Sequence, residues 1–223
     1  KYIRKSLTHN SENNQLRNQL YDITKTPDEI EEIDIKDKYK VIKERRNSKL
    51  KSDYGVVTLI DQYIVNILPE GGRKSKVVLV YEIIDEYGIE QMKEYQLNTY
   101  SLTLQKSEIV KADGSIVPAE EGSGTLVFSN LAIGDVIYIE YESYSNSTGR
   151  FYKDFNLDCY FNSTYPTVEA VFAIINPENV NYSTKLFNGN ITPIVKKINN
   201  KTCTIWKRTN VPAMPLLEPY SKN

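Results

Sequence analysis

Apolar and polar residues alternate with a period of two along much of this chain, from about residue 54 onward. Over residues 136–142, Ile137, Ile139 and Tyr141 fall on one side of an extended chain, and the residues between them fall on the other. Successive side chains of a β-strand point to opposite faces, so this segment is predicted to be a strand. The same reasoning predicts further strands over residues 57–67, 77–84, 102–109, 168–175 and 202–206.

The strand predicted over residues 57–67 contains one interruption. Its apolar positions, which include Val57, Tyr63 and Val65, follow the alternating pattern, and Asp61 alone places a charge among them. The strand predicted over residues 168–175 is apolar on both sides, which is typical of a strand buried on both faces.

Turn residues separate the predicted strands. Asp113-Gly114 and Gly134-Asp135 are tight-turn dipeptides, because glycine adopts a positive φ without steric cost. Residues 69–72, 188–190 and 199–201 carry similar signals. Residues 85–88 are expected to form a hairpin turn, with a return strand over residues 89–97.

Many short strands with polar turns, and no helical pattern between them, predict a mainly β fold. We expect an antiparallel β-sandwich of many short strands with a short N-terminal helical extension. A parallel sheet built from alternating strands and helices is disfavoured.

The first fifty residues have a helical rather than an extended pattern. Leu16, Leu20 and Ile23 have the spacing of a narrow apolar helical stripe that ends near Thr24. A second helix is predicted over residues 27–49, with Thr26 as its N-cap. Apolar residues are sparse in it, so docking on the β domain, pairing with another partner and partial disorder remain open.

These patterns divide the chain into three parts. Residues 1–50 are predicted to be a helical or partly disordered extension, residues 51–210 the β-sandwich domain, and residues 211–223 a proline-rich exit linker. Proline cannot donate to a strand ladder, so the last part cannot be a central strand.

Charge and length narrow the possible partners. The 223 residues have a formal net charge of −1 and are 40% hydrophobic, which is ordinary for a globular protein with a sizeable core. A nucleic-acid partner is not expected, because the only basic cluster, near residues 43–51, follows many acidic residues. No run approaches the ~20 apolar residues of a membrane span.

Few residues offer catalytic chemistry. His9 is the only histidine and precedes the predicted β domain, so Cys159 and Cys203 lack a credible general base. Both cysteines are predicted to lie on strands as small buried hydrophobes, and a disulfide between them is left open. We therefore expect no catalytic residue, metal site or cofactor within this chain.

Carboxylate pairs leave a calcium site or a hydrolase dyad as alternatives. All of them lie in predicted turns, where acidic residues are common for conformational reasons. They are Glu120-Glu121, Asp85-Glu86, and Asp113 with Asp135.

Tyrosine is enriched, with 17 tyrosines against 6 phenylalanines and 1 tryptophan. Exposed aromatic rings on a sheet bind sugars or peptides in many proteins, whereas tyrosine is also a favoured residue of half-buried strand faces. The candidate ligand or partner surface consists of Tyr138, Tyr144, Tyr152 and Tyr160.

Several short motifs occur in a characteristic order. They comprise Tyr54-Gly55-Val56-Val57-Thr58-Leu59, Asp85-Glu86-Tyr87-Gly88, Ala112-Asp113-Gly114-Ser115-Ile116-Val117, Phe128-Ser129-Asn130-Leu131, Gly134-Asp135-Val136-Ile137, and Val211-Pro212-Ala213 with Glu218. In order and spacing, residues 51–220 resemble the bacterial family known as domain of unknown function 3857. In that family, a β-sandwich lies N-terminal to a transglutaminase-like domain.

The resemblance implies a non-catalytic accessory role beside a transglutaminase-like domain of the same polypeptide, with any catalytic Cys, His and Asp beyond Asn223. It also implies a periplasmic or cell-envelope-associated protein. It supplies no ligand, so a glycan- or peptide-binding module that uses the tyrosine-rich surface remains the alternative.

Overall fold

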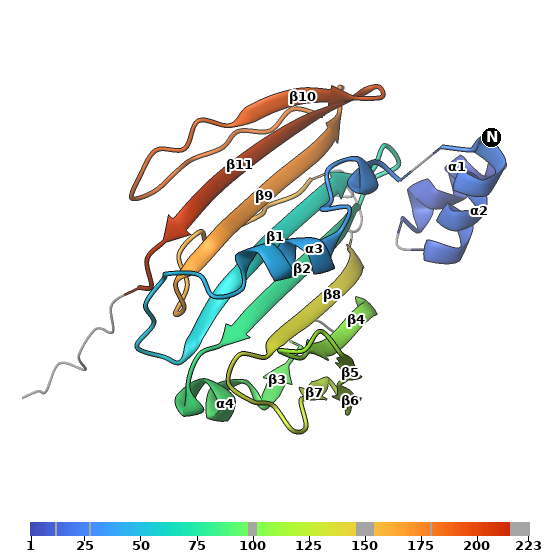
Figure 1. Cartoon of the computed structure of the whole chain (residues 1–223). Coiled ribbons are helices and arrows are strands. Elements are labelled where there is room, and N and C mark those ends of the chain that lie inside the picture. Colours follow the sequence, from blue (N-terminus) through green and yellow to red (C-terminus); the bar gives the residue numbers. More distant parts are fainter. Residues whose placement is uncertain (12, 27, 98–101, 146–153, 179, 215–223) are drawn as a thin grey trace, which may run out of the picture.

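The computed structural model describes residues 1–11, 13–26, 28–97, 102–145, 154–178 and 180–214. Its main feature is an eight-stranded sheet in the order β10-β11-β9-β1-β2-β8-β4-β5 (Figure 1). The strands are β1 (Val56–Ile67), β2 (Arg73–Ile83), β4 (Leu102–Val110), β5 (Ile116–Pro118), β8 (Val136–Ser145), β9 (Thr167–Pro177), β10 (Ile194–Ile198) and β11 (Lys201–Val211). The predicted mainly β class is confirmed.

One strand pair departs from the predicted antiparallel arrangement. Strands β1 and β9 run parallel, with Thr58 opposite Thr167 and Asn66 opposite Ile175. The other described neighbours in the sheet are antiparallel, so the sheet is mixed and the antiparallel-only prediction was wrong. Alternation of apolar residues reports which strands are buried but carries no information about their direction, and so it could not reveal this pair.

A second, much smaller sheet lies over one end of the large one. Its strands, in the order β3-β7-β6, are β3 (Glu94–Gln96), β7 (Thr125–Val127) and β6 (Glu120–Glu121). Leu126 and Phe128 are buried there against Ile83 and Ile137 of the large sheet. The second layer thus consists of three short strands at the end of the sheet where α4 also lies (Figure 1).

Residues 85–88 do not form the predicted hairpin turn. Asp85 is the N-cap of helix α4 (Glu86–Met92), and its carboxylate accepts a hydrogen bond from Gly88 N at 3.0 Å. Aspartate before a helix satisfies an otherwise unpaired backbone N–H, and this cap explains why a helix forms here. Only residues 94–96 of the expected return strand are extended.

The N-terminal segment contains helices α1 (Tyr2–His9) and α2 (Asn14–Thr24), a 3-10 helix η1 (Glu29–Glu32) and helix α3 (Lys38–Arg45). Helix α2 ends at Thr24 as predicted. The single helix predicted over residues 27–49 was wrong, because two aspartates interrupt it. Asp28 caps η1 through Ile30 N, and Asp37 caps α3 through Lys40 N.

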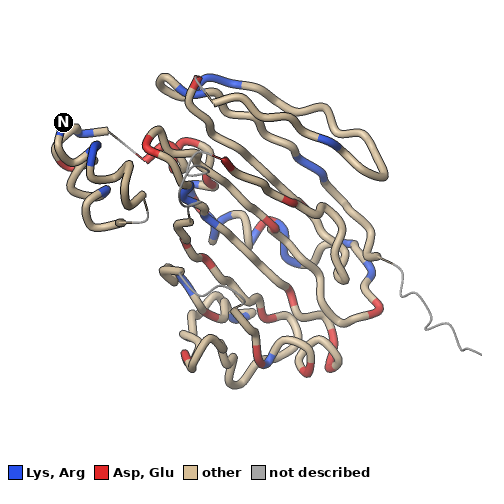
Figure 2. The backbone as a smooth tube through the Cα atoms, turned by 180° about the vertical axis from the view of Figure 1, so that it is seen from behind, with Lys and Arg blue, Asp and Glu red and all other residues tan. Residues whose placement is uncertain are grey.

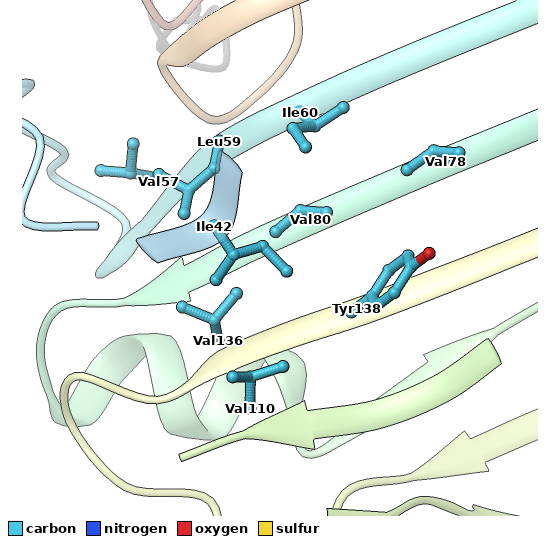
Figure 3. Packing of buried hydrophobic residues seen from close by; sticks show 9 residues of the cluster. All are labelled: Ile42, Val57, Leu59, Ile60, Val78, Val80, Val110, Val136 and Tyr138. Carbon is cyan, nitrogen blue, oxygen red and sulfur yellow. The ribbon is translucent and has the colours of Figure 1, made fainter. Parts of the chain in front are cut away.

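The two faces of the large sheet have different covers. Helix α3 crosses one face, here called the helix face, and its Ile42 is fully buried against residues that include Val57, Val80 and Val136 (Figure 3). The residues from η1 to α3 therefore pack on the sheet. The opposite face, called the cavity face, carries the side chains of Ile83, Ile137 and their alternating neighbours.

Helices α1 and α2 contact the turn between β1 and β2. Arg4 and Arg17 both pair with Glu70 in that turn, and the Arg17 side chain is almost completely buried. Figure 2 shows that basic and acidic residues are interspersed over helices and strands, in keeping with the net charge of −1. Among the described residues, no helix is both long and apolar enough to cross a membrane.

Strand β11 ends at Val211, and the described chain continues to Met214, whose N–H donates to Ser163 O at 2.9 Å. The rest of the predicted exit linker, residues 215–223, lies outside the described residues.

Candidate ligand-binding site on the cavity face

The motifs singled out in the sequence meet at one end of the large sheet. Gly55 O accepts a hydrogen bond from Ile84 N at 2.9 Å, and a Cβ atom on Gly88 would lie only 1.9 Å from that oxygen. Phe128 and Leu131 pack in the same cluster as Ile137. Asp135 pairs with Lys111 at 2.6 Å beside the Asp113-Gly114 turn. These motifs thus pack together at the end of the sheet where α4 and the small sheet lie.

A network of paired charges occupies the helix face. Lys76 contacts Glu31, Asp34 and Glu140 at 2.7–2.9 Å, and Asp34 also accepts from Gln62. Farther along, Lys201 pairs with Glu29 at 3.0 Å. Burial alone would lower the pKa of Lys76, but hydrogen bonds to the three carboxylates raise it above the usual lysine range.

The same network keeps Asp34 ionised. Burial would raise the pKa of this carboxyl, whereas hydrogen bonds from Lys38, Lys76 and Gln62 lower it below its usual value. Each buried charge of this group thus has an opposite charge beside it, which is the arrangement that a structural ion network requires.

The cavity face contains a hollow of about 720 Å³, called the Asp61 cavity. Its floor is formed by strands β1, β2 and β8, and residues 158–163 form part of its wall. The lining residues are Asp61, Tyr63, Arg73, Ser75, Val77, Leu79, Tyr141, Ser143, Tyr144, Ser145, Asp158, Cys159, Tyr160, Asn162 and Ser163. A second hollow of about 670 Å³ adjoins it through Asp158 and Cys159, and includes Phe172 and Trp206.

Asp61 is the exceptional group of this cavity. It lies opposite Leu79 of β2 and Ala170 of β9, so its neighbours across both strands are apolar. Among the described residues, no hydrogen bond or ion pair reaches its carboxylate. Burial raises the pKa of Asp61 from 3.8 to about 6.

The register of β1 explains why a charge points here. A register shift between Thr58 and Ile60 moves the alternation by one residue. Val57 therefore faces the helix side, whereas Asp61 and Tyr63 face the cavity. Asp61 stood out in the sequence as the single charge within an apolar strand, but the sequence did not reveal the cavity around it.

The two cysteines lie on opposite sides of the sheet and are free. Cys203 is buried on the helix face, while Cys159 lines the cavity in an irregular segment, so the strand predicted at Cys159 was wrong. Burial raises the pKa of Cys159 to about 12, with a smaller contribution from Asp61, and burial raises that of Cys203 to about 11. Both thiols are therefore protonated at neutral pH.

The four tyrosines of the predicted surface are not all brought together. Tyr160 lines the Asp61 cavity and is 79% exposed. Tyr144 also borders the cavity, but its ring centroid lies 5.8 Å from Lys74 Nζ, and Lys74 pairs with Asp28 on the helix face. Tyr138 lies on the helix face, buried, and donates a hydrogen bond to Glu140. Tyr152 lies outside the described residues. Tyr63 and Tyr141 line the cavity but were not in the predicted set.

The carboxylates of the predicted turns have local partners. Asp113 accepts from Ser115 N at 2.8 Å, and Ser107 and Ser129 donate to Glu121 and Glu120. Among the described residues, no cluster of three or more His, Cys, Asp and Glu is arranged to hold a metal ion. In the same residues, no hydrogen bond joins His9 to either cysteine.

Two solved structures match parts of this chain to different extents. A putative protease from Parabacteroides distasonis matches with a TM-score of 0.64 at 15% identity, over 76% of this chain and 38% of that protein. An M1 zinc metallopeptidase from Deinococcus radiodurans matches with a TM-score of 0.41 at 11% identity, over 72% of this chain and 41% of that one. The chain thus spans well under half of either protein.

No curated protein matches this sequence. A family model does match, described as a Domain of Unknown Function with solved-structure structure (DUF3857), over residues 123–215. The matched range includes the motifs at residues 128–131, 134–137 and 211–213. The motifs at residues 54–59, 85–88 and 112–117 precede it, and Glu218 follows it. The resemblance to the DUF3857 family is confirmed over residues 123–215, which match the family model.

Proposed function

We propose that this chain is a non-catalytic accessory domain that positions or gates an adjacent transglutaminase-like domain, with cysteine-protease or acyl-transfer chemistry, in a larger exported bacterial protein. In this proposal, the mainly β scaffold is the counterpart of the β-sandwich that precedes such domains in the family.

The observation that carries the proposal is the state of the two thiols. A cysteine nucleophile reacts as a thiolate and is normally activated by a nearby base or positive charge. Cys159 and Cys203 instead have pKa values raised to about 12 and 11. The putative protease of similar fold is in keeping with this reading, since most of its length lies outside the match.

Activity measurements on this chain test the proposal. The purified chain is assayed for peptidase and acyl-transfer activity, beside Cys159→Ser and Cys203→Ser variants. We expect no turnover that depends on either thiol. Turnover that disappears in one of these variants would refute the accessory role.

Linkage to a neighbour is tested separately. The reading frame that encodes these residues should also encode a transglutaminase-like domain with Cys, His and Asp. Removing the DUF3857 domain from that longer protein should change its turnover or substrate range. A reading frame without such a domain contradicts the positioning role.

A second candidate function is a peptide- or glycan-binding module, favoured by the Asp61 cavity. A volume of about 720 Å³ lies within the roughly 300–1,000 Å³ typical of small-molecule pockets. Tyrosine rings offer flat apolar area with a polar tip, which suits both ligand classes.

Peptide and glycan arrays probed with the wild type and Tyr160→Ala test this candidate. Tyr160 is exposed, so its removal should weaken binding without unfolding the domain. Tyr2→Ala, at a tyrosine that is 87% exposed on helix α1, is the matched control. If the wild type and both variants bind the arrayed peptides and glycans equally well, binding through the cavity is refuted.

A further inference from the structure

The Asp61 carboxylate is a largely desolvated acidic group to which no hydrogen bond or ion pair is made by the described residues. Burying an ionised group is costly unless an opposite charge or a hydrogen-bond donor compensates it. On the helix face, the buried charges around Lys76 and Asp34 all have such partners. Asp61 has none among the described residues, although it lies in the middle of an ordered sheet.

The surroundings of Asp61 define the missing partner. Leu79 and Val77 form an apolar floor, and the cavity carries tyrosines 63, 141 and 160. The Asp61 charge also raises the pKa values of Tyr81, Tyr95 and Tyr141, after the larger effects of burial and of neighbouring tyrosines, so the carboxylate acts on these hydroxyls electrostatically. A carboxylate beside aromatic rings is suited to a cation with an alkyl stem, because rings attract cations over their faces.

We propose that the Asp61 cavity binds a primary alkylammonium group of a peptide, with Asp61 as its counter-ion and the tyrosine rings around its stem. This inference rests on the second candidate function and identifies its ligand chemistry. The ammonium has two possible sources, a lysine side chain or a peptide amino terminus. Arg73, at the edge of the cavity, carries the charge needed for an acidic group elsewhere on the same peptide.

Cavity shape favours a peptide over a free amine. The hollow lies next to the second one of about 670 Å³, whose lining includes Phe155, Tyr182 and Trp206. Together, the two hollows follow the cavity face from β8 to β11, and residues 158 and 159 line both. An extended peptide can therefore place its ammonium at Asp61 and continue over the aromatic residues.

Three small probes test the proposal by NMR titration or calorimetry. Nα-acetyl-lysine methylamide carries only the side-chain ammonium, alanine methylamide only the terminal ammonium, and Nα-acetyl-norleucine methylamide neither. We expect one ammonium probe to bind at least about tenfold more tightly than the norleucine probe, as a charge-assisted hydrogen bond implies. The ammonium probe that binds identifies the source.

Two carboxylates, one inside the cavity and one outside it, supply the matched variants. Asp61→Asn should weaken the ammonium probe at least about tenfold, whereas Asp22→Asn, at an exposed position of helix α2 outside the cavity, should leave it within about twofold. Tyr160→Ala, also exposed, should weaken it several-fold and keeps the test valid if Asp61→Asn misfolds.

Binding should also depend on pH in every protein that retains Asp61. The groups that face Asp61 are Tyr81 and Arg73 of β2, Tyr141 of β8, Tyr95 of β3, Cys159, and Tyr63 of its own strand, with Asp158 at the edge. As pH rises through about 6, Asp61 ionises and affinity for the ammonium probe should rise, then level off. Asp61→Asn should remove this rise, and Asp22→Asn should keep it.

Each remaining outcome overturns the inference. Equal affinity for the norleucine and ammonium probes refutes charge recognition but leaves peptide binding by the cavity intact. Unchanged affinity in a folded Asp61→Asn protein excludes Asp61 as the counter-ion. If neither ammonium probe binds the wild type, the site itself is refuted. The accessory role is unaffected by that result, because it is tested separately by thiol-dependent turnover.

Discussion

The two faces of the large sheet differ in whether a buried charge has a partner of opposite charge. On the helix face, Lys76 has three carboxylates within 2.7–2.9 Å. On the cavity face, Asp61 sits between Leu79 and Ala170 with no partner among the described residues. Burial of a charge is therefore not by itself the sign of a site in this protein. The absence of a compensating partner is what distinguishes the cavity face.

Stability should respond in opposite directions on the two faces. Removing one member of a paired network leaves the others uncompensated, whereas removing an unpaired charge relieves a cost. Four predictions test this comparison, in order of decreasing effect.

Lys76→Met should cause the largest loss of stability. It leaves Glu31, Asp34 and Glu140 without their shared cation, and breaking a buried ion pair in this way costs about 3–5 kcal/mol. Urea unfolding measures the change. Lys93→Met is the control, because its exposed pair with Glu90 should contribute nothing measurable. A loss no greater than that of the control would show that the network is not structural.

Gly88→Ala tests the closed end of the cavity face. The new Cβ would lie 1.9 Å from Gly55 O, so backbone must shift, and we expect a loss of about 2–4 kcal/mol. Gly114→Ala is the control. Gly114 has φ 90° with no atom within 4 Å of the added Cβ, so only the strain of its backbone applies, about 1 kcal/mol. Equal losses would mean that the Gly55–Gly88 contact tolerates a side chain.

Asp61→Asn should stabilise the protein at pH 7. The folded-state pKa of Asp61 is raised to about 6, so the folded form holds the proton more tightly than the unfolded one. The stability contributed by the protonated carboxyl is present below about pH 4 and is lost as pH rises through about 6. The variant should lack this loss. Its free energy of unfolding at pH 7 should therefore exceed that of the wild type by on the order of 2 kcal/mol. Thermal unfolding between pH 4 and 8 measures it, and identical pH profiles would contradict the unpaired charge.

The two cysteines should differ only slightly in their rates of alkylation in the native protein. With pKa values of about 12 and 11, both should react with iodoacetamide at pH 8 far more slowly than free cysteine. Cys159, in the cavity, should react before Cys203, which is fully buried. Mass spectrometry of the alkylated peptides records the order. Rapid labelling of either thiol would weaken the accessory role.

Much of the fold could be predicted from the sequence, because alternation and turn residues act locally. Strands β8 and β9 and the turn at Asp113-Gly114 follow directly from such signals. Helix α4 did not, because its start depends on the cap that Asp85 forms and on the approach of Gly55. The helix predicted over residues 27–49 was divided by aspartates whose capping role competes with helix propensity.

The candidate site was harder to predict than the strands. Asp61 was visible as a charge in an apolar strand, but the residues that line the cavity with it come from β2, β8 and residues 158–163, which are distant in sequence. Tyr138 and Tyr160 are close in sequence, yet they lie on opposite sides of the sheet. Sequence proximity therefore suggested a single tyrosine surface. In the structure, Tyr138 of β8 packs on the helix face, whereas Tyr160 belongs to the irregular segment that lines the cavity.

The parallel pairing of β1 with β9 has a consequence for how the chain folds. Partner β2 follows β1 after a short turn, whereas Thr58 and its β9 partner Thr167 are 109 positions apart. Pairings between distant segments form slowly, because chain entropy is lost before the contact is gained. During synthesis, one edge of β1 therefore stays open until β9 has left the ribosome. An open strand edge invites association with other chains, so this interval is when the nascent protein is most exposed to aggregation.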